Sequence, residues 1–205
     1  MGKPYKILED RFKNLSINES NIVLEIGSDM GEGSTLFFSN WSKQNNTPFY
    51  SIDVSSRAKI MYPNEGINFE IVDSGSEWCK NILPGLNKKI KVLYLDNFDW
   101  IWNLDKQPDY VGKLIESYLQ RGVIMNNKNS QEEHRLQSLY LLPYMDDESV
   151  VIFDDTWNCK ATNTCEKGSE NEYEGKGGTS ISMFINDGFT IEDYKDYIVG
   201  FRKCY

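Results

Sequence analysis

A glycine-rich stretch suited to ligand binding lies at residues 25–35 (EIGSDMGEGST), at the end of a short apolar run. Gly27, Gly31 and Gly33 let the chain turn sharply and bring its backbone against a ligand. A helical pattern follows, so the unpaired N–H groups of the first helical turn would face that ligand. A nicotinamide-type fingerprint would read GxGxxG, which these glycines do not. The pattern indicates a nucleotide-type or adenosyl-type site, with a plain strand-to-helix turn as the alternative.

Acidic residues close the other apolar runs. Asp53 ends the second run, where a carboxylate can accept both hydroxyls of an adenosine ribose. This role is shared by dinucleotide enzymes and methyltransferases, so it supports an adenosine ligand without choosing between them. The alternative is a solvated aspartate at the end of a strand.

Five short apolar runs must position these residues, at 22–27, 49–53, 69–73, 90–96 and 150–155. Their continuous apolarity is typical of strands that are buried on both faces of a parallel sheet. Helical patterns lie between the runs, so we expect a doubly wound, mostly parallel α/β sheet of seven strands. In such a sheet the acids that end the runs gather along one edge.

The helices expected around this sheet are a leading helix at 3–18, one at 33–43 and one at 130–145. The last opens with Ser130 and Glu133, which read as a capping box. We expect a single domain over 1–205, with insertions at 101–129 and 158–178 that cover the active site. The first insertion contains a further helical pattern at 109–121, and the second is too long for an ordinary loop.

Composition excludes several classes of protein. The formal net charge is −9 and the pI is about 4.7, which disfavours a nucleic-acid partner and an anionic membrane surface. No run is apolar enough to span a bilayer or to form the core of a signal peptide, so we expect a cytoplasmic protein. A homodimer is left open.

The four cysteines are scattered and the chain has one histidine, which argues against a zinc site. Disulfides are not expected in a cytoplasmic protein. The pair Cys159 and Cys165 is the one plausible loop staple.

Taken together, VLEIGSDMGEGSTL, Asp53, IVDSGSEW, VLYLDNFDW and VVIFDDTW resemble the class I S-adenosylmethionine-dependent methyltransferases. More narrowly, they are similar to O-methyltransferases of the catechol and macrolide-sugar types. The resemblance covers roughly residues 20 to 160. It implies a Rossmann-like methyltransferase fold and a cofactor site at Glu25, Gly27, Ser28, Gly31, Gly33, Ser34, Asp53, Asp73, Ser74 and Ser76. The chain has one extra residue in the glycine turn, which puts the roles of residues 29–33 in question.

In the metal-dependent members of that group, acids after the fourth and fifth strands bind one divalent cation. Asp96, Asp154 and Asp155 match those positions, and three converging carboxylates would also need compensation on physical grounds. The resemblance therefore implies a metal site, with Mg²⁺ as the expected ion, and makes Asp96 a catalytic residue as well as a metal ligand. Capping of the following loop is the alternative role for Asp154 and Asp155.

The proton acceptor for methyl transfer is less clear from the sequence. The related families place Lys or His three residues after the fourth-strand acid, where this chain has Asp99. His134 is the other candidate base, although a histidine near a helix start is more commonly solvated. Four aromatic residues could line a substrate pocket or belong to the core: Trp100, Trp102, Trp157 and Tyr173.

These patterns predict an S-adenosylmethionine-dependent O-methyltransferase that acts on a small molecule or sugar with the help of a divalent cation. One alternative is an NAD(P)-dependent oxidoreductase, which the glycine spacing and the lack of a Tyr-x-x-x-Lys pair disfavour. Another is a non-catalytic scaffold that binds the cofactor. A nucleic-acid methyltransferase is disfavoured by charge, since the only short basic run, at 86–91, lies at the opposite edge from the predicted site.

Overall fold

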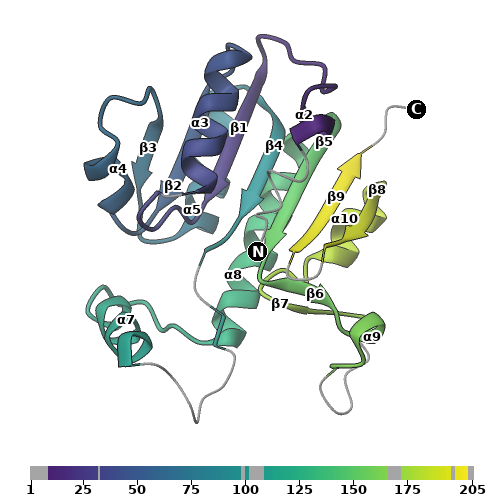
Figure 1. The fold of residues 1–205 in the computed structure, drawn as a ribbon. Coiled ribbons are helices and arrows are strands. Elements are labelled where there is room, and N and C mark those ends of the chain that lie inside the picture. Colours follow the sequence, from purple (N-terminus) through teal and green to yellow (C-terminus); the bar gives the residue numbers. More distant parts are fainter. Residues whose placement is uncertain are drawn as a thin grey trace.

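A single mostly parallel sheet organises the chain (Figure 1). The computed structural model describes residues 9–31, 33–97, 100–101, 109–165, 172–194 and 197–202. Within them the sheet has seven strands in the order β3-β2-β1-β4-β5-β9-β8. The strands are β1 (Asn21–Ile26), β2 (Phe49–Asp53), β3 (Asn68–Ile71), β4 (Lys89–Leu95), β5 (Met145–Asp154), β8 (Phe189–Asp193) and β9 (Tyr197–Arg202).

The first five of these strands, in spatial order from β3 to β5, are parallel, and β9 is antiparallel to both of its neighbours. The strand order reverses beside β1, because β2 pairs with one side of β1 and β4 with the other. A crevice at the carboxyl ends of the strands is expected at such a reversal. The predicted doubly wound, mostly parallel seven-stranded sheet is confirmed.

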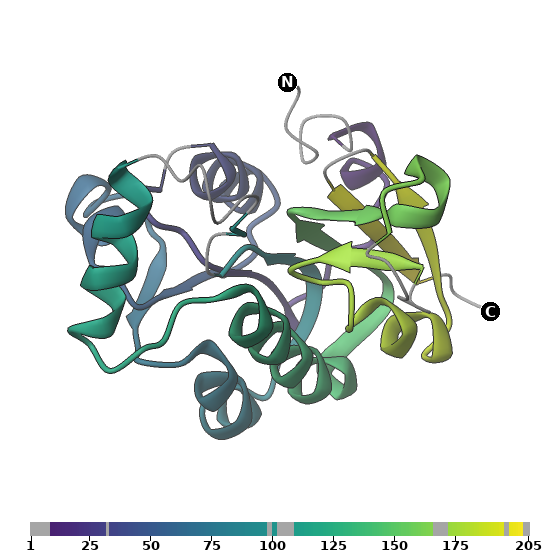
Figure 2. The ribbon, with the colours of Figure 1, turned by 90° about the horizontal axis from the view of Figure 1, so that it is seen from below.

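Helices cover both faces of the sheet (Figures 1 and 2). One face packs against α2 (Glu9–Phe12) and α3 (Ser34–Gln44) through a cluster that includes Phe12, Phe38 and Trp41. The other face packs against three helices, α5 (Gly75–Asn81), α8 (Asn127–Leu141) and α10 (Ile181–Asn186). Successive residues of β1 alternate between these two clusters, which is why all six of its residues are buried.

The remaining elements connect the sheet or extend it. They are α4 (Arg57–Met61), α6 (Leu83–Leu86), α7 (Asp109–Leu119), the 3-10 turn η2 (Leu142–Tyr144), α9 (Cys159–Thr162) and a hairpin of β6 (Thr156–Asn158) with β7 (Tyr173–Gly175). In Figure 1, α7 and the β6–β7 hairpin lie below the sheet, beyond the ends of the parallel strands. Both inserted segments therefore contribute to the edge where the strand-end acids gather.

Three local predictions need correction. Helix α8 begins at Asn127, and Asn126 rather than Ser130 caps it by accepting the N–H of Asn129 at 2.8 Å. The helix ends at Leu141, and β5 begins five residues before the predicted strand. A disulfide joins Cys159 and Cys165, whose Cα atoms lie 4.7 Å apart across the single turn of α9.

The predicted leading helix at 3–18 is described only from residue 9 onward, where α2 spans Glu9–Phe12. Within the described residues, no helix combines the length and the apolar character that a membrane span requires.

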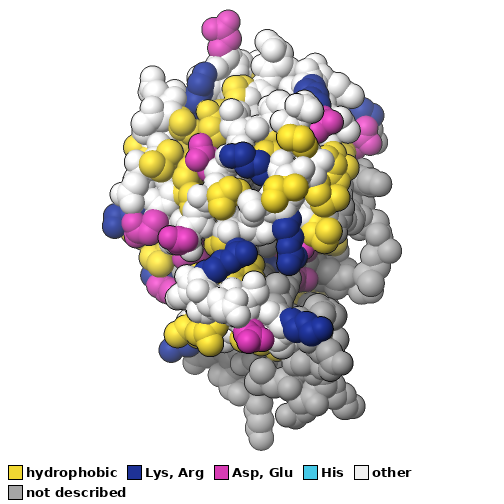
Figure 3. Space-filling model, turned by 90° about the vertical axis from the view of Figure 1, so that its left-hand side faces the viewer, with side chains coloured by type: hydrophobic (Ala, Val, Ile, Leu, Met, Phe, Trp, Pro, Cys, Tyr) yellow, Lys and Arg dark blue, Asp and Glu magenta, His cyan; other side chains and the backbone are white. Residues whose placement is uncertain are grey.

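Figure 3 faces the β3 edge of the sheet, where hydrophobic side chains are scattered among charged ones. Exposed apolar residues of this region include Ile60, Met61 and Ile71.

A matched pair of variants tests which apolar residues hold the sheet together. Phe38→Ala removes a side chain that is 0% exposed between α3 and the sheet, and we expect it to lower the free energy of unfolding by about 3–5 kcal/mol. Ile60→Ala removes a side chain that is 72% exposed and should change it by less than about 0.5 kcal/mol. Urea unfolding followed by circular dichroism measures both, and equal losses would contradict this description of the core.

Candidate functional site

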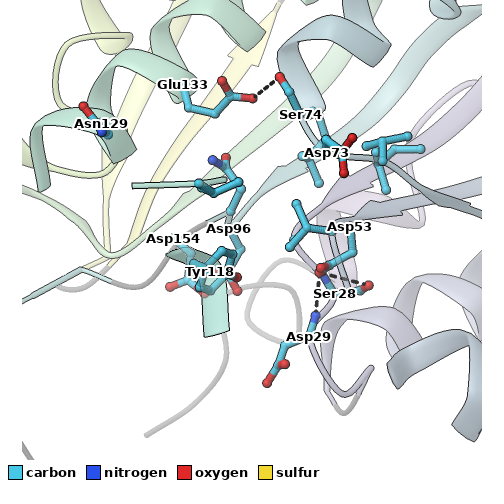
Figure 4. Close-up of a pocket in the computed structure, with 18 of the residues that line it drawn as sticks. Ser28, Asp29, Asp53, Asp73, Ser74, Asp96, Tyr118, Asn129, Glu133 and Asp154 are labelled. Carbon is cyan, nitrogen blue, oxygen red and sulfur yellow. Dashed lines mark hydrogen bonds between the residues drawn. The ribbon is translucent and has the colours of Figure 1, made fainter. Parts of the chain in front are cut away.

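A cavity of about 620 Å³ opens at the carboxyl edge of the sheet. Its walls come from the ends of β1, β2, β4 and β5 and from the segment that joins α7 to α8. Figure 4 shows Asp53 and Asp73 on one side of this cavity and Asp96 and Asp154 on another. A volume of this size lies within the range typical of small-molecule sites.

The glycine turn is held to β2 by Asp53. One carboxylate oxygen of Asp53 accepts the backbone N–H groups of Ser28 at 2.6 Å and Asp29 at 2.8 Å, and the other accepts the N–H of Ser55 at 2.6 Å. Gly27 has φ +95°, and a Cβ there would lie 2.4 Å from the carbonyl oxygen of Asp96. Glycine is therefore required at 27, where the end of β1 crosses the end of β4.

A second polar group forms where α5 begins. Ser74 caps the helix by accepting the N–H of Glu77 at 3.2 Å. Glu133, on α8, accepts the backbone N–H of Ser76 at 2.7 Å and its hydroxyl at 2.9 Å. Since a carboxylate is favoured at a helix N-terminus, Glu133 ties α8 to α5 beside the cavity. The capping box predicted for Ser130 and Glu133 did not reveal this contact.

Glu25 is fully buried in β1, below the glycine turn. One of its carboxylate oxygens accepts hydroxyl hydrogen bonds from Thr35 at 2.8 Å and Ser51 at 2.9 Å, while the other has no partner. Burial raises the pKa of Glu25 to about 7, although the nearby hydroxyls of Ser34, Thr35 and Ser51 oppose the shift. The side chain is therefore poised between its neutral and charged forms near neutral pH.

A buried lysine joins the ends of β4 and β5. The ammonium Nζ of Lys176 lies 2.6 Å from Oδ1 of Asp96 and 3.0 Å from Oδ2 of Asp155. The side chain of Lys176 is only 1% exposed. Burial alone would lower its pKa, but Asp96, Asp155 and Asp154 raise the pKa of Lys176 above its ordinary value. The lysine is therefore a fixed positive charge.

The negative charge of Asp154 is compensated differently from the charges of Asp96 and Asp155. The hydroxyl of Tyr94 donates to its Oδ2 at 2.5 Å, and the N–H of Asp155 donates to its Oδ1 at 2.8 Å. Burial raises the pKa of both Asp96 and Asp154 above the usual aspartate range. For Asp96, the charge of Asp154 adds to this effect and the charge of Lys176 opposes it.

The geometry does not support His134 as the base. His134 is 0% exposed on α8, and its Nε2 lies 3.1 Å from the carbonyl oxygen of Asn97. Burial and the charge of Lys176 lower the pKa of His134 to about 3, and the ring does not line the cavity. Asp99 lies outside the described residues. Of the three predicted catalytic residues, Asp96 is the one that the structure places in the cavity wall.

Six of the ten predicted cofactor residues also line the cavity: Gly27, Ser28, Ser34, Asp53, Asp73 and Ser74. The other four, Glu25, Gly31, Gly33 and Ser76, do not line it. Of the predicted aromatic residues, Trp100 packs edge-on against Trp157 with ring centroids 5.9 Å apart, away from the cavity, and Trp102 lies outside the described residues. Tyr94, Tyr118 and Tyr197 line the cavity instead.

The cavity wall is strongly acidic. It contains seven carboxylates, and the described part of the chain contributes no lysine, arginine or histidine side chain to it. The seven are Asp29, Asp53, Asp73, Asp96, Glu132, Glu133 and Asp154. Such a wall attracts a cationic ligand and repels phosphate groups.

The acid cluster does not fit the predicted magnesium ion in its present arrangement. A divalent cation shared by Asp96 and Asp155 would lie about 2.0–2.6 Å from an oxygen of each, and the ammonium of Lys176 occupies that bridging position. Among the described residues, the one group of three such ligand atoms within 4.8 Å of one another is Cys159, Cys165 and Glu174. Its two sulfurs form a disulfide, so it offers no thiolate ligands.

Comparison with known proteins gave matches among solved structures alone, because no family model and no curated protein sequence matches this chain. The MycE methyltransferase from the mycinamycin biosynthetic pathway, solved with Mg and SAH, superposes with a TM-score of 0.56 at 11% identity. The match covers 97% of this chain and 48% of MycE, so this chain spans about half the length of that protein.

Two further structures show the same fold. A protein described as a ribosomal RNA methyltransferase, from Plasmodium falciparum, matches with a TM-score of 0.54 at 17% identity, covering 98% of this chain and 95% of that one. The CurJ carbon methyltransferase matches with a TM-score of 0.55 at 11% identity, over 98% and 53% of the two chains. At these identities the likeness establishes the fold.

The substitution Glu25→Gln tests whether the buried carboxyl group of Glu25 titrates near neutral pH. Because the folded protein raises the pKa of Glu25 from 4.5 to about 7, its stabilising contribution is fully present below pH 4.5 and is lost as the pH rises through 7. Relative to Glu25→Gln, wild type should lose about 3 kcal/mol of unfolding free energy over that interval. Urea unfolding from pH 4 to 8 measures this difference.

Glu70→Gln, at an exposed position of β3, controls for the loss of one negative charge. Parallel stability curves for wild type and Glu25→Gln would show that the carboxyl group of Glu25 does not titrate in this range.

Proposed function

We propose that this chain is an S-adenosylmethionine-dependent methyltransferase. The observation that carries the proposal is the cavity wall, with seven carboxylates and no basic side chain from the described residues, at the switch point of a methyltransferase-like sheet. S-adenosylmethionine carries a positive sulfonium and an ammonium group and no phosphate. A dinucleotide carries a pyrophosphate, which an acidic wall repels. The SAH bound to MycE on the same fold agrees with this choice.

The cofactor would lie along the ends of β1 and β2. Asp53 would accept the ribose hydroxyls through the oxygen that now accepts only the Ser55 N–H, since a carboxylate oxygen can accept two hydrogen bonds. Asp73 and Ser74 would border the adenine, at the side of the cavity shown in Figure 4. The methionine portion would lie beside Gly27, which lines the cavity where β1 ends.

The proposed acceptor is a hydroxyl group of a small molecule or sugar. In the transfer step, the bond between the methyl carbon and the sulfonium sulfur breaks as a bond from the acceptor oxygen to that carbon forms. The hydroxyl proton passes to a carboxylate, and S-adenosylhomocysteine and a methyl ether are released. Asp96 is the proton acceptor we propose, because it lines the cavity, whereas His134 is buried and does not line it.

The segment after α7 encloses the acceptor side. Tyr118, Val123 and Ile124 line the cavity, and Arg121 donates to the carbonyl oxygen of Val54 at 2.8 Å. This contact ties the end of α7 to the end of β2 across the cavity rim. A small acceptor fits such an acidic site better than a polyanion does.

Magnesium has no step in this proposal. The MycE complexes contain Mg, and the sequence of this chain predicts the ion at Asp96, Asp154 and Asp155. In the structure, however, the ammonium of Lys176 lies between Asp96 and Asp155. The main alternative is a scaffold that binds the cofactor without catalysis. Asp96 and Asp154 face an open cavity rather than a closed pocket, which favours the enzyme.

The cofactor proposal is tested by calorimetry. We expect wild type to bind S-adenosylmethionine and S-adenosylhomocysteine with micromolar dissociation constants and to give no heat with NAD. Asp53→Ala should weaken both affinities at least about tenfold, which corresponds to about 1.4 kcal/mol. The reason is that it removes the proposed ribose contact and releases the glycine turn from β2.

Asp147→Asn is the matched control, because Asp147 is exposed near the amino end of β5, at the opposite edge of the sheet. It should bind both ligands as wild type does. Heat with NAD and none with S-adenosylmethionine or S-adenosylhomocysteine would overturn the proposed function.

A further inference from the structure

Lys176 is placed at the sheet edge by its backbone and not only by its charge. Its N–H donates to the carbonyl oxygen of Asp155 at 3.0 Å, and the next N–H, of Gly177, donates to the hydroxyl oxygen of Thr156 at 2.9 Å. From α8, the side-chain amide of Gln131 donates to the carbonyl oxygen of Gly175 at 3.1 Å. The lysine is therefore fixed relative to both β5 and α8.

The glycines on either side of Lys176 make this placement possible. Gly175 has φ +89°, and a Cβ there would lie 1.9 Å from the carbonyl oxygen of Asp155. A Cβ on Gly177 would lie 2.6 Å from the ring of Phe153. Because a larger residue at either position would push the segment away from β5, the sequence GKGG seats the ammonium group between the two strand ends.

A buried lysine is rare unless it is paired, since taking the ammonium out of water costs several kcal/mol. Here the pairing is with Asp96 from β4 and Asp155 from β5, both within 3.0 Å. Asp154 receives its hydrogen bonds from Tyr94 and from the N–H of Asp155. Every acid of the cluster therefore has a compensating partner supplied by the protein itself.

We propose that Lys176 is the built-in cation of this acid cluster, which takes the place of a divalent metal and positions Asp96 toward the cavity. Lys176 does not line the cavity, so it is a positioning residue that acts through Asp96. That Lys176 excludes a metal ion follows from the geometry alone. That it positions Asp96 as the proton acceptor rests on the proposed function. With Lys176 in place, the ammonium and a metal ion compete for the same carboxylate oxygens.

Binding of Mn²⁺, followed by electron paramagnetic resonance, tests this proposal without cofactor or methyl acceptor. Wild type should bind Mn²⁺ at least tenfold more weakly than Lys176→Met, which frees oxygens of Asp96 and Asp155 to act as ligands. The double variant Lys176→Met/Asp155→Asn should lose the gained affinity. Failure of S-adenosylmethionine to bind in calorimetry would overturn the proposed function and leave this result standing.

Lys91→Met is the matched control. Lys91 is the other strongly buried lysine among the described residues, with Nζ 3.4 Å from Asp146 at the opposite edge of the sheet. Its replacement by methionine should leave Mn²⁺ affinity at the wild-type level. A general loosening of the protein would raise Mn²⁺ binding in both lysine variants, and that outcome would contradict a specific role for Lys176.

Two other results would overturn the proposal. One is tight Mn²⁺ binding by wild type that Asp155→Asn abolishes, and the other is a folded Lys176→Met that binds Mn²⁺ no better than wild type. If Lys176→Met does not fold, Lys176→Arg serves instead, because it keeps the positive charge and should exclude Mn²⁺ as wild type does. Mn²⁺ binding by Lys176→Arg at a site that requires Asp155 would then refute the proposal.

Discussion

Three carboxylates meet where β4 and β5 end, and the repulsion between them constrains everything around the candidate site. Parallel strands side by side deliver Asp96 and the Asp154–Asp155 pair to one edge, where burial weakens the screening by water. The protein meets this constraint with an ammonium group that is itself 1% exposed. That ammonium requires the tight glycine segment after β7, so the packing of a distant loop sets the electrostatics of the strand ends.

The same acid excess underlies the ligand preference that we propose for the cavity. Lys176 compensates the negative charge of the acid cluster without lining the cavity. The cavity wall therefore stays negative and has no basic side chain from the described residues. This negative potential favours binding of a sulfonium cofactor and disfavours binding of phosphate-containing cofactors and nucleic acids. The acid excess behind the net charge of −9 therefore includes the carboxylates that line this cavity.

Much of the frame could be predicted from local pattern. The five apolar runs identified β1 to β5, because a strand buried on both faces must be apolar without interruption. The gathering of Asp53, Asp96 and Asp154 at one edge followed from that, whereas the crossing of Gly27 with the end of β4 was seen only in the structure. Ser130 misled because Asn126 offers an equally good cap one turn earlier. Lys176 was missed because its role depends on its ion pair with Asp96 and on the hydrogen bond from Gln131 to the neighbouring Gly175, and both partners are far away in the sequence. The run GKGG, with glycines flanking one lysine, was the available signal.

In this account the cavity binds the cofactor while Lys176, and not a metal ion, compensates the acid cluster. A crystal structure grown with S-adenosylhomocysteine and Mg²⁺ tests both statements directly. We expect the ribose hydroxyls at Asp53 and the homocysteine portion beside Gly27. We also expect the ammonium of Lys176 still between Asp96 and Asp155, with no metal there. A ligand outside this cavity, or a magnesium ion bound to these acids with Lys176 displaced, would contradict the account.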